Sequence, residues 1–258
     1  MIQSLSRSKE IEKISGRFGT IIVDECHHIP AKSFREAIVN FNSYYLYGLT
    51  ATPKRKNNDE KLIYFYIGSI LYNADQVERI RQKQIKVEIN IKDTNLYVPF
   101  NYKIDKYETI SKILIHDTNR NTLILDDIEK NSSRFKTFLI LTERKAHVDI
   151  LNLYLKEKYE TITIHGEDSE SSRKSKIEQL KQGHFKIVIS TGQYFGEGID
   201  LNNLECLMIA YPFAFEGKLV QYIGRIQHSG NPPVIFDYRD SKIDYFEKMF
   251  RQRNRYYK

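Results

Sequence analysis

The 258-residue sequence contains 40 Lys and Arg against 33 Asp and Glu, a net charge of +7 that is compatible with a polyanionic partner. Its 41% hydrophobic and 28% charged content are ordinary for a soluble globular protein of one to two domains. No apolar run approaches the length of a membrane span, and the polar start Met1–Lys9 is not a signal peptide. We therefore expect no membrane partner and a cytoplasmic location.

The two cysteines, Cys26 and Cys206, are far apart and do not form a disulfide framework. Cys26, His27 and His28 are consecutive, and no second cluster offers the remaining ligands of a zinc site. A reducing compartment fits both observations.

In the first part of the chain, a helix over 4–17 and a strand over 20–23 are predicted. The β-branched run of that strand predicts burial on both faces. A helix with one apolar face (Phe34, Ala37 and Ile38), a strand over 44–49 and an aromatic-rich closing segment over 62–70 follow. The charged, apolar-poor stretch Gln76–Lys86 predicts a domain boundary around residues 74–86, which we place between residues 75 and 76.

Strands and helices alternate through the second part of the chain. Strands are predicted over 87–91, 138–141, 161–164, 187–190, 206–210 and 234–236. Helical spacing is expected within 102–130, at Val148–Leu155, over 169–182 with Gly183 as C-cap, and from 241 to the end. Such alternation predicts an α/β fold with mainly parallel sheets flanked by helices.

Two adjacent carboxylates, Asp24 and Glu25, follow the first predicted strand. Ligands of open α/β sheets collect at the carboxyl ends of strands. One such acid can hold Mg²⁺ through water, and its neighbour can orient an attacking water. The alternative is that the acids only cap the following helix.

The letters Asp24-Glu25-Cys26-His27-His28 and Gly48–Pro53 resemble motifs II and III of superfamily 2 helicases, in the DEAH/DECH branch that includes XPB-like DNA helicases. In the second half, Leu141–Arg144 resembles motif IV, and His165-Gly166 with Arg173 resembles the next segment. Thr191–Asp200 and then Gln221–His228, after Tyr211-Pro212, resemble motifs V and VI.

This resemblance implies two RecA-like lobes: residues 1–75 as the C-terminal part of an incomplete first lobe, and 76–258 as a connecting segment and the second lobe. It also implies the role of each matching residue. Asp24 would hold Mg²⁺ and Glu25 would be the base, while Thr50 and Thr52 would couple the nucleotide site to the nucleic-acid site. Gly198, Asp200 and Gln221 would approach ATP, Arg225 and His228 would complete the catalytic set, and Arg144, Thr191 and Gly192 would contact nucleic acid.

The sequence departs from the family pattern in two places. It contains no G-x-x-x-x-G-K-[ST] loop, whose backbone N–H groups and lysine cradle phosphates. It also has His228 where the family's motif VI ends in arginine, and histidine lacks the planar guanidinium fork. ATP and Mg²⁺ are therefore expected cofactors only if the missing loop is supplied.

Three interpretations remain open. The chain is part of an ATP-dependent helicase or translocase whose phosphate loop lies upstream or on a partner polypeptide; or it is a nucleic-acid-binding module without ATPase activity; or it is an inactive remnant. DNA is the expected nucleic acid, with RNA as the alternative, and contacts to the backbone would make binding salt-dependent. On each interpretation the isolated chain is expected to lack ATPase activity.

Overall fold

The computed structural model describes residues 10–50, 59–72, 87–192, 204–214, 222–223, 233–255 and 257. The chain divides into two compact units, Met1–Arg81 and Gln82–Lys258. The predicted boundary between residues 75 and 76 falls outside the described residues. Each unit is therefore described by itself.

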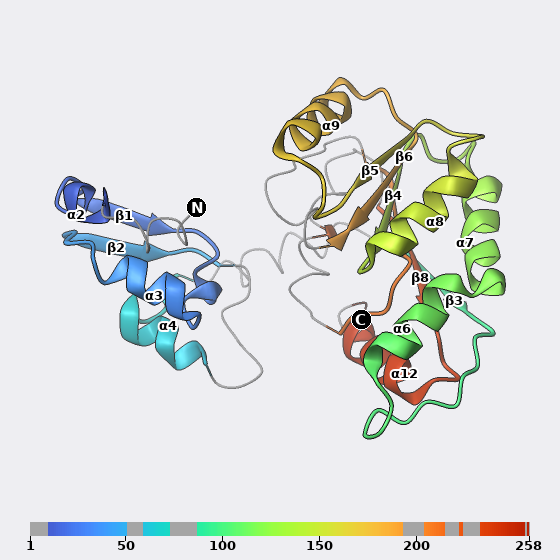
Figure 1. The fold of residues 1–258 in the computed structure, drawn as a ribbon, viewed down its shortest axis with the longest axis horizontal. Coiled ribbons are helices and arrows are strands. Elements are labelled where there is room, and N and C mark those ends of the chain that lie inside the picture. Colours follow the sequence, from blue (N-terminus) through green and yellow to red (C-terminus); the bar gives the residue numbers. More distant parts are fainter. Residues whose placement is uncertain are drawn as a thin grey trace. The chain divides into compact units, whose positions relative to one another are not determined.

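The first unit contains a two-stranded parallel sheet with short helices (Figure 1). Its elements are α2 (Glu10–Ile14), β1 (Thr20–Val23), the 3-10 turn η1 (Cys26–His28), α3 (Lys32–Ile38), β2 (Tyr45–Gly48) and α4 (Glu60–Tyr66). Strand β1 pairs with β2 from Thr20 opposite Tyr45 to Val23 opposite Gly48. The parallel register brings the carboxyl ends of both strands to one edge. The predicted helix over 4–17 is described only over Glu10–Ile14.

Only one face of this small sheet is covered within the described part of the unit. Val23 packs with Ile38 of α3 and Ile63 of α4, together with Ile21 and Leu46. Side chains alternate between the two faces of a strand, and Ile22 is 62% exposed on the other face, where Tyr45 and Tyr47 are also exposed. The prediction that β1 is buried on both faces was wrong, because helices cover one face alone.

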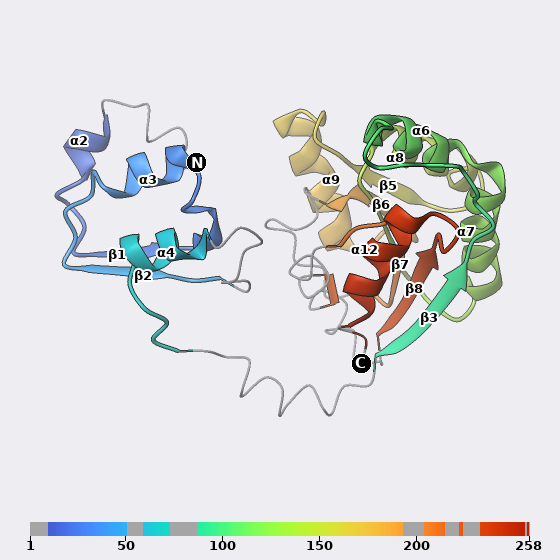
Figure 2. The same ribbon diagram turned by 90° about the horizontal axis from the view of Figure 1, so that it is seen from below.

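The second unit is built on a six-stranded parallel sheet of order β3-β8-β7-β4-β6-β5 (Figures 1 and 2). Its strands are β3 (Glu88–Asp93), β4 (Phe138–Thr142), β5 (Thr161–Ile164), β6 (Ile187–Thr191), β7 (Cys206–Ile209) and β8 (Val234–Arg239). Its helices are α6 (Tyr107–His116), α7 (Thr118–Asn131), α8 (Lys145–Leu155), α9 (Glu170–Gln182) and α12 (Asp244–Asn254). The predicted α/β fold with mainly parallel sheets is confirmed.

Alternate residues of the central strands feed separate cores on the two faces. Ile140 of β4 and Ile189 of β6 pack with Val148 and Leu151 of α8 and with Ile128 of α7. On the opposite face, Leu139 and Leu141 pack with Leu180 of α9 and with Tyr222. Strands β4 and β6 are buried at every position, as expected for parallel strands covered on both sides.

The helix ends follow local sequence signals. The stretch 102–130, predicted as helical, is two helices because Asp117 ends α6 and caps α7, accepting a hydrogen bond from the Arg120 N–H at 2.7 Å. Ser169 caps α9 in the same way, and Gly183 ends it in the left-handed conformation (φ 75°), which confirms the predicted C-cap. Among the helices of the described residues, none is long and apolar enough to cross a membrane.

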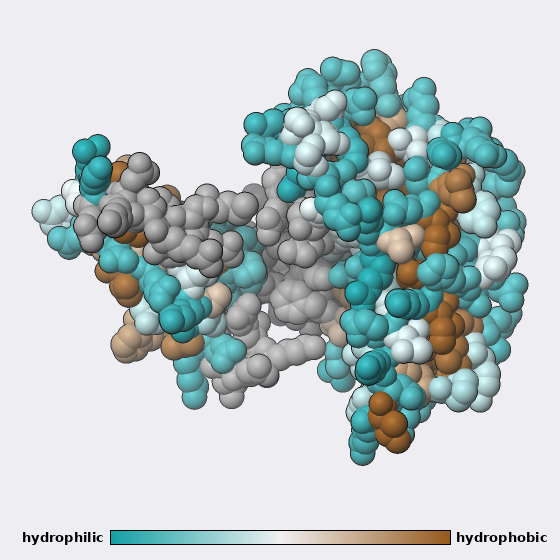
Figure 3. All heavy atoms as spheres, viewed as in Figure 1, coloured by the Kyte–Doolittle hydropathy of each residue, from teal (hydrophilic) through white to brown (hydrophobic). Residues whose placement is uncertain are grey.

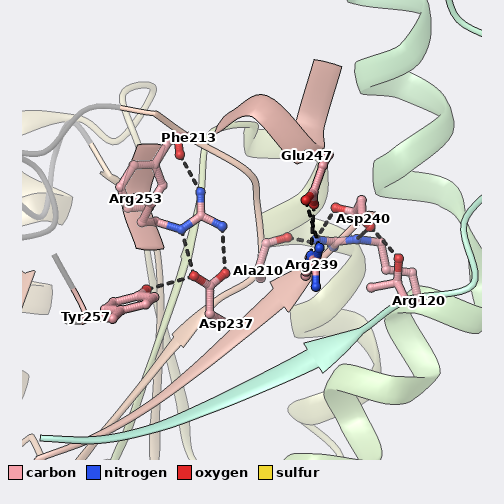
Figure 4. A network of polar contacts seen from close by, with 10 residues as sticks. Arg120, Ala210, Phe213, Asp237, Arg239, Asp240, Glu247, Arg253 and Tyr257 are labelled. Carbon is pink, nitrogen blue, oxygen red and sulfur yellow. Dashed lines mark hydrogen bonds and ion pairs between the residues drawn. The ribbon is translucent and has the colours of Figure 1, made fainter. Parts of the chain in front are cut away.

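Two buried ion pairs fix α12 and α7 to the sheet (Figure 4). Arg253 of α12 donates from Nε and Nη2 to the two carboxylate oxygens of Asp237 in β8, each at 2.7 Å, and Tyr257 donates to Asp237 as well. Arg120 of α7 donates from Nε to Asp240 Oδ1 at 2.9 Å, just beyond the end of β8. Buried charges require such partners, because removal of one partner would leave the other charge buried and unpaired.

Candidate functional site

The acid pair lies where β1 ends and the chain turns sharply. Glu25 has φ 49° and ψ 45°, a left-handed conformation that is uncommon outside glycine. Its backbone N–H donates to Asp24 Oδ1 at 2.8 Å, so one carboxylate oxygen of Asp24 is engaged in the turn itself. The Asp24 side chain is exposed and Glu25 is half-buried. The strained turn thus presents two carboxylates side by side at the strand end.

His27 connects this acid pair to the end of the neighbouring strand. Its Nδ1 atom forms a 3.0 Å hydrogen bond with Thr50 Oγ1 and lies 3.0 Å from Glu25 Oε2, within ion-pair distance. The Thr50 hydroxyl can donate to or accept from this nitrogen, depending on the imidazole tautomer, whereas a carboxylate can only accept. A single histidine atom therefore contacts both a predicted catalytic residue and a predicted coupling residue.

Backbone packing holds these two strand ends together. The Cys26 N–H donates to the Leu49 carbonyl at 2.9 Å, and the Cys26 side chain is buried against Gly48. A Cβ atom at Gly48 would lie 2.8 Å from Cys26 Sγ and 2.6 Å from Ile67 Cδ1, so any side chain here would force Cys26 or Ile67 to shift. Burial raises the pKa of the Cys26 thiol, which makes it a packing residue rather than a thiolate nucleophile.

In the second unit, the predicted nucleic-acid residues gather at the carboxyl ends of β4 and β6. Thr142 pairs with Thr191 across these strands, so Arg144 and Gly192 follow neighbouring strand ends. Thr191 is 9% exposed, and its Oγ1 is buried without a hydrogen-bond partner among the described residues. The structure therefore brings Arg144, Thr191 and Gly192 to one edge of the sheet.

Arg144 is held in place by α6. Its Nε donates to Ser111 Oγ at 2.8 Å, its Nη2 lies 3.7 Å from Glu108, and its guanidinium lies over the Tyr107 ring. Ser111 also accepts from the Tyr211 hydroxyl at 2.7 Å. The guanidinium is thus oriented at the sheet edge while its side chain stays 36% exposed.

Gly192 makes room for Tyr222. A Cβ atom at Gly192 would overlap the Tyr222 hydroxyl and approach Glu143 Oε1 to 3.1 Å. Tyr222 is 1% exposed and packs edge-on against Phe213 at 5.9 Å between ring centroids. Burial, with a smaller contribution from Glu143, raises the pKa of its phenol, so the hydroxyl stays protonated.

Six of the predicted site residues lie outside the described residues: Thr52, Gly198, Asp200, Gln221, Arg225 and His228. In the described part of the chain, no group of three or more His, Cys, Asp or Glu side chains could hold a metal ion. One exposed carboxylate is nevertheless sufficient protein ligation for a hydrated Mg²⁺ that is also bound by substrate phosphates. Asp24 fits that requirement.

Comparison with known proteins identifies the family. Residues 1–55 match the family described as Type III restriction enzyme, res subunit, and residues 105–230 match the helicase conserved C-terminal domain. The chain belongs to the superfamily 2 helicases. Both matched segments contain the motifs on which the resemblance was based.

Individual relatives of this superfamily 2 helicase chain are also named as helicases. It is 28% identical over 265 residues to a protein of Acanthamoeba polyphaga mimivirus named as an ATP-dependent RNA helicase, covering all of this chain and 50% of that protein. It is 25% identical over 239 residues to a Saccharomyces cerevisiae protein named as ATP-dependent helicase IRC3, covering 84% of this chain and 33% of that protein. The chain thus spans half or less of the length of these two relatives.

A solved structure shows the same fold. Dbp5 of S. cerevisiae, bound to RNA and ADP BeF3, aligns with a TM-score of 0.64 at 13% identity, covering 92% of this chain and 58% of that one. At this identity the likeness concerns the fold, which is that of RecA-like helicases.

Sequence reasoning missed two residues that shape the site of this helicase-family chain. His27 was read only as part of the motif, yet it contacts both Glu25 and Thr50. In the sequence, Tyr222 is only one position of the segment Gln221–His228, yet its buried side chain lies against Gly192. A histidine two residues after a carboxylate was the available signal for the first. For the second, no sequence signal pointed to the packing.

Proposed function

We propose that this chain is part of an ATP-dependent nucleic-acid helicase or translocase, in which ATP hydrolysis between two RecA-like lobes drives movement on nucleic acid. The observation that supports this best is the double contact of His27, whose Nδ1 atom lies 3.0 Å from both Glu25 Oε2 and Thr50 Oγ1. In a motor, the residue that activates water for ATP hydrolysis and the residues that bind nucleic acid must respond to the same conformational change. A shared histidine gives that connection a physical basis.

In this proposal Asp24 holds Mg²⁺ and Glu25 orients the attacking water. Mg²⁺ would neutralise charge on the phosphates when it is bound with nucleotide. Asp24 keeps one carboxylate oxygen beyond the one that accepts the Glu25 N–H, and its side chain is exposed. Glu25 is kept in orientation by its own left-handed backbone and by His27. We assign Thr50 and Thr52 to coupling.

For the second unit we assign Arg144, Thr191 and Gly192 to nucleic-acid contacts, with DNA as the expected substrate and RNA as the alternative. Gly198, Asp200 and Gln221 would contact nucleotide, and Arg225 and His228 would face its phosphates. This assignment rests on the motif matches and, for the first three, on their common place at the carboxyl ends of β4 and β6.

The proposal also requires a segment with a G-x-x-x-x-G-K-[ST] loop, which these 258 residues do not contain. Such a segment, on this or a partner polypeptide, would cover the open face of the sheet of the first unit. The open face of that sheet supports this step: Ile22, Tyr45 and Tyr47 are 62%, 60% and 42% exposed, whereas parallel sheets are normally covered on both faces.

The test is reconstitution. We expect the 258-residue chain alone to hydrolyse no ATP with or without single-stranded DNA or RNA. Fusion of its N-terminus to a RecA-like segment that carries a G-x-x-x-x-G-K-[ST] loop should give hydrolysis that nucleic acid stimulates and that Glu25→Gln abolishes. If a folded fusion that binds ATP remains inactive with both nucleic acids, the motor assignment is wrong.

A second candidate function is a nucleic-acid-binding module without ATPase activity, favoured by the missing phosphate loop and by His228 in place of arginine. Tight ATP binding by the isolated chain would contradict it. In the active fusion, His228→Arg should raise turnover if the histidine limits charge stabilisation, since an arginine finger contributes roughly 10³–10⁵ in rate.

A further inference from the structure

A row of three tyrosines with a cation at each end extends from Arg144 across the second unit. The Arg144 guanidinium lies 5.6 Å from the centroid of the Tyr107 ring, and Tyr107 lies 5.7 Å from Tyr245. Tyr245 stacks on Tyr102 at 6.3 Å with an interplanar angle of 30°, and Lys248 Nζ lies 4.8 Å over the Tyr102 ring. We call these five residues the cation–aromatic row.

The row joins parts of the chain that are distant in sequence. Tyr102 lies in the segment between β3 and α6, Tyr107 begins α6, and Arg144 precedes α8. Tyr245 and Lys248 lie on one face of α12, as their spacing of three residues requires. The buried pair of Arg253 with Asp237 anchors α12 to the sheet, so this end of the row stands on a rigid support.

The outer end of the row is open to solvent. Tyr102 is 51% exposed, and Lys248 is also exposed. Residues 101–106 are exposed at all six positions. In Figure 3 this segment lies at the lower rim of the second unit, where hydrophilic atoms surround a hydrophobic group. A cluster that served packing alone would bury its aromatic rings, whereas Tyr102 stays about half exposed although Tyr245 and Lys248 both contact it.

Three lysines lie around the outer end, and three acids lie close to them in sequence. Lys103, Lys106 and Lys248 are exposed, and none forms an ion pair with another described residue. The acids nearby are Asp105, Asp244 and Glu108, and Glu108 already lies 3.7 Å from Arg144. Exposed lysines without an ion-pair partner among the described residues, beside an exposed and supported tyrosine, can bind single-stranded nucleic acid, in which bases stack on rings and phosphates contact cations.

We infer that the cation–aromatic row is a stacking site for single-stranded nucleic acid, which extends the strand's path from Arg144 to Tyr102 and Lys248. The inference rests on the proposed function, because Arg144 is the proposed contact at its inner end. A base would stack on the exposed part of Tyr102, and the flanking phosphates would contact Lys248, Lys103 and Lys106. Stacking tolerates any base, so the site carries no sequence preference.

The test measures binding of fluorescein-labelled dT15 and rU15 to the purified chain by fluorescence anisotropy. Tyr102→Ala should weaken binding about tenfold, whereas Tyr102→Phe, which keeps the ring, should bind within about twofold of wild type. Tyr154→Ala is the matched control, because Tyr154 is 55% exposed on α8 and is not part of the row. Circular dichroism confirms that each variant is folded.

Salt dependence separates the roles of the lysines. Replacing Lys103, Lys106 and Lys248 together by alanine should lower the slope of log affinity against log salt by about two, since each single-strand phosphate contact contributes about 0.7. An unchanged slope, or wild-type affinity for Tyr102→Ala in a chain that does bind, would overturn the inference and point to the row as a protein-docking surface. Failure of the wild-type chain to bind either oligonucleotide would instead remove the proposed function and the inference with it.

Discussion

His27 Nδ1 and Thr50 Oγ1 are 3.0 Å apart, although 23 residues separate them in sequence. The contact exists because β1 and β2 are parallel and in register, so the segments that follow both strands leave the sheet at the same edge. Glu25 Oε2 lies 3.0 Å from the same nitrogen. A movement of the Thr50 segment would therefore shift His27 and, through it, the Glu25 carboxylate that we propose as base.

Thr50→Val should weaken this connection. The substitution keeps the shape of the side chain and removes a part-buried hydrogen bond, for which the expected loss is about 1 kcal/mol. Hydrogen exchange of the Cys26 amide, whose N–H donates to Leu49, would report faster opening of the strand ends. Thr50→Ser should retain protection, and Thr20→Val, at an exposed position of β1, should have no effect. Equal protection in Thr50→Val and wild type would show that the contact does not stabilise this edge.

Gly192→Ala should destabilise the second unit by about 1–3 kcal/mol, because its Cβ overlaps the Tyr222 hydroxyl and buried overpacking has that typical cost. The double variant Gly192→Ala with Tyr222→Phe should regain at least half of the loss. Tyr222→Phe alone should be nearly neutral, because the hydroxyl is buried with no hydrogen-bond partner among the described residues. Urea denaturation of the four proteins gives the comparison. Strict additivity of the two substitutions would refute the steric explanation.

Arg253→Met should lower the free energy of unfolding far more than loss of a surface ion pair would. It leaves the Asp237 carboxylate buried without its bidentate partner, for which about 3–5 kcal/mol is expected. The matched control is Lys174→Met, which breaks a 3.1 Å pair with Glu170 between two well-exposed side chains and should leave the denaturation midpoint unchanged. Similar midpoints for both variants would mean that Arg253 does not anchor α12.

His147 should make the second unit sensitive to mild acid. Its Nδ1 accepts from Thr142 Oγ1 at 2.8 Å and its Nε2 donates to Asn121 Oδ1 at 3.0 Å, so the neutral ring satisfies both neighbours. Burial, with Arg120 and His116 nearby, holds the pKa of this imidazole well below its usual range. The unfolded chain takes up a proton near pH 6.5 and the folded chain does not. The free energy of unfolding should therefore fall by roughly 1 kcal/mol per pH unit below 6.5.

Urea midpoints at pH 7.0 and 5.5 check this dependence. His147→Gln keeps a neutral polar side chain and should show a smaller difference between the two pH values than wild type. His184→Gln, at an exposed position at the end of α9, should retain the wild-type difference. If His147→Gln loses as much stability on acidification as wild type, another group titrates.

The sequence alone determined the α/β class, most strands and the cap at Gly183, because hydrophobic runs and terminating residues are local signals. It also led to the helicase family, because the motifs occur as short, ordered segments. It misjudged β1, since a β-branched run does not reveal whether a second layer covers it. Ile22 is 62% exposed despite its composition.

Tertiary structure alone decided which side chains meet. The contact of His27 with Thr50 depends on strand register, the place of Tyr222 against Gly192 depends on close packing, and the row from Arg144 to Lys248 depends on α12 returning beside α6. Each brings together residues separated by more than 20 positions in the chain. These distances of a few ångströms depend on how strands and helices from distant parts of the chain pack together. They therefore cannot be inferred from the residues of either segment alone.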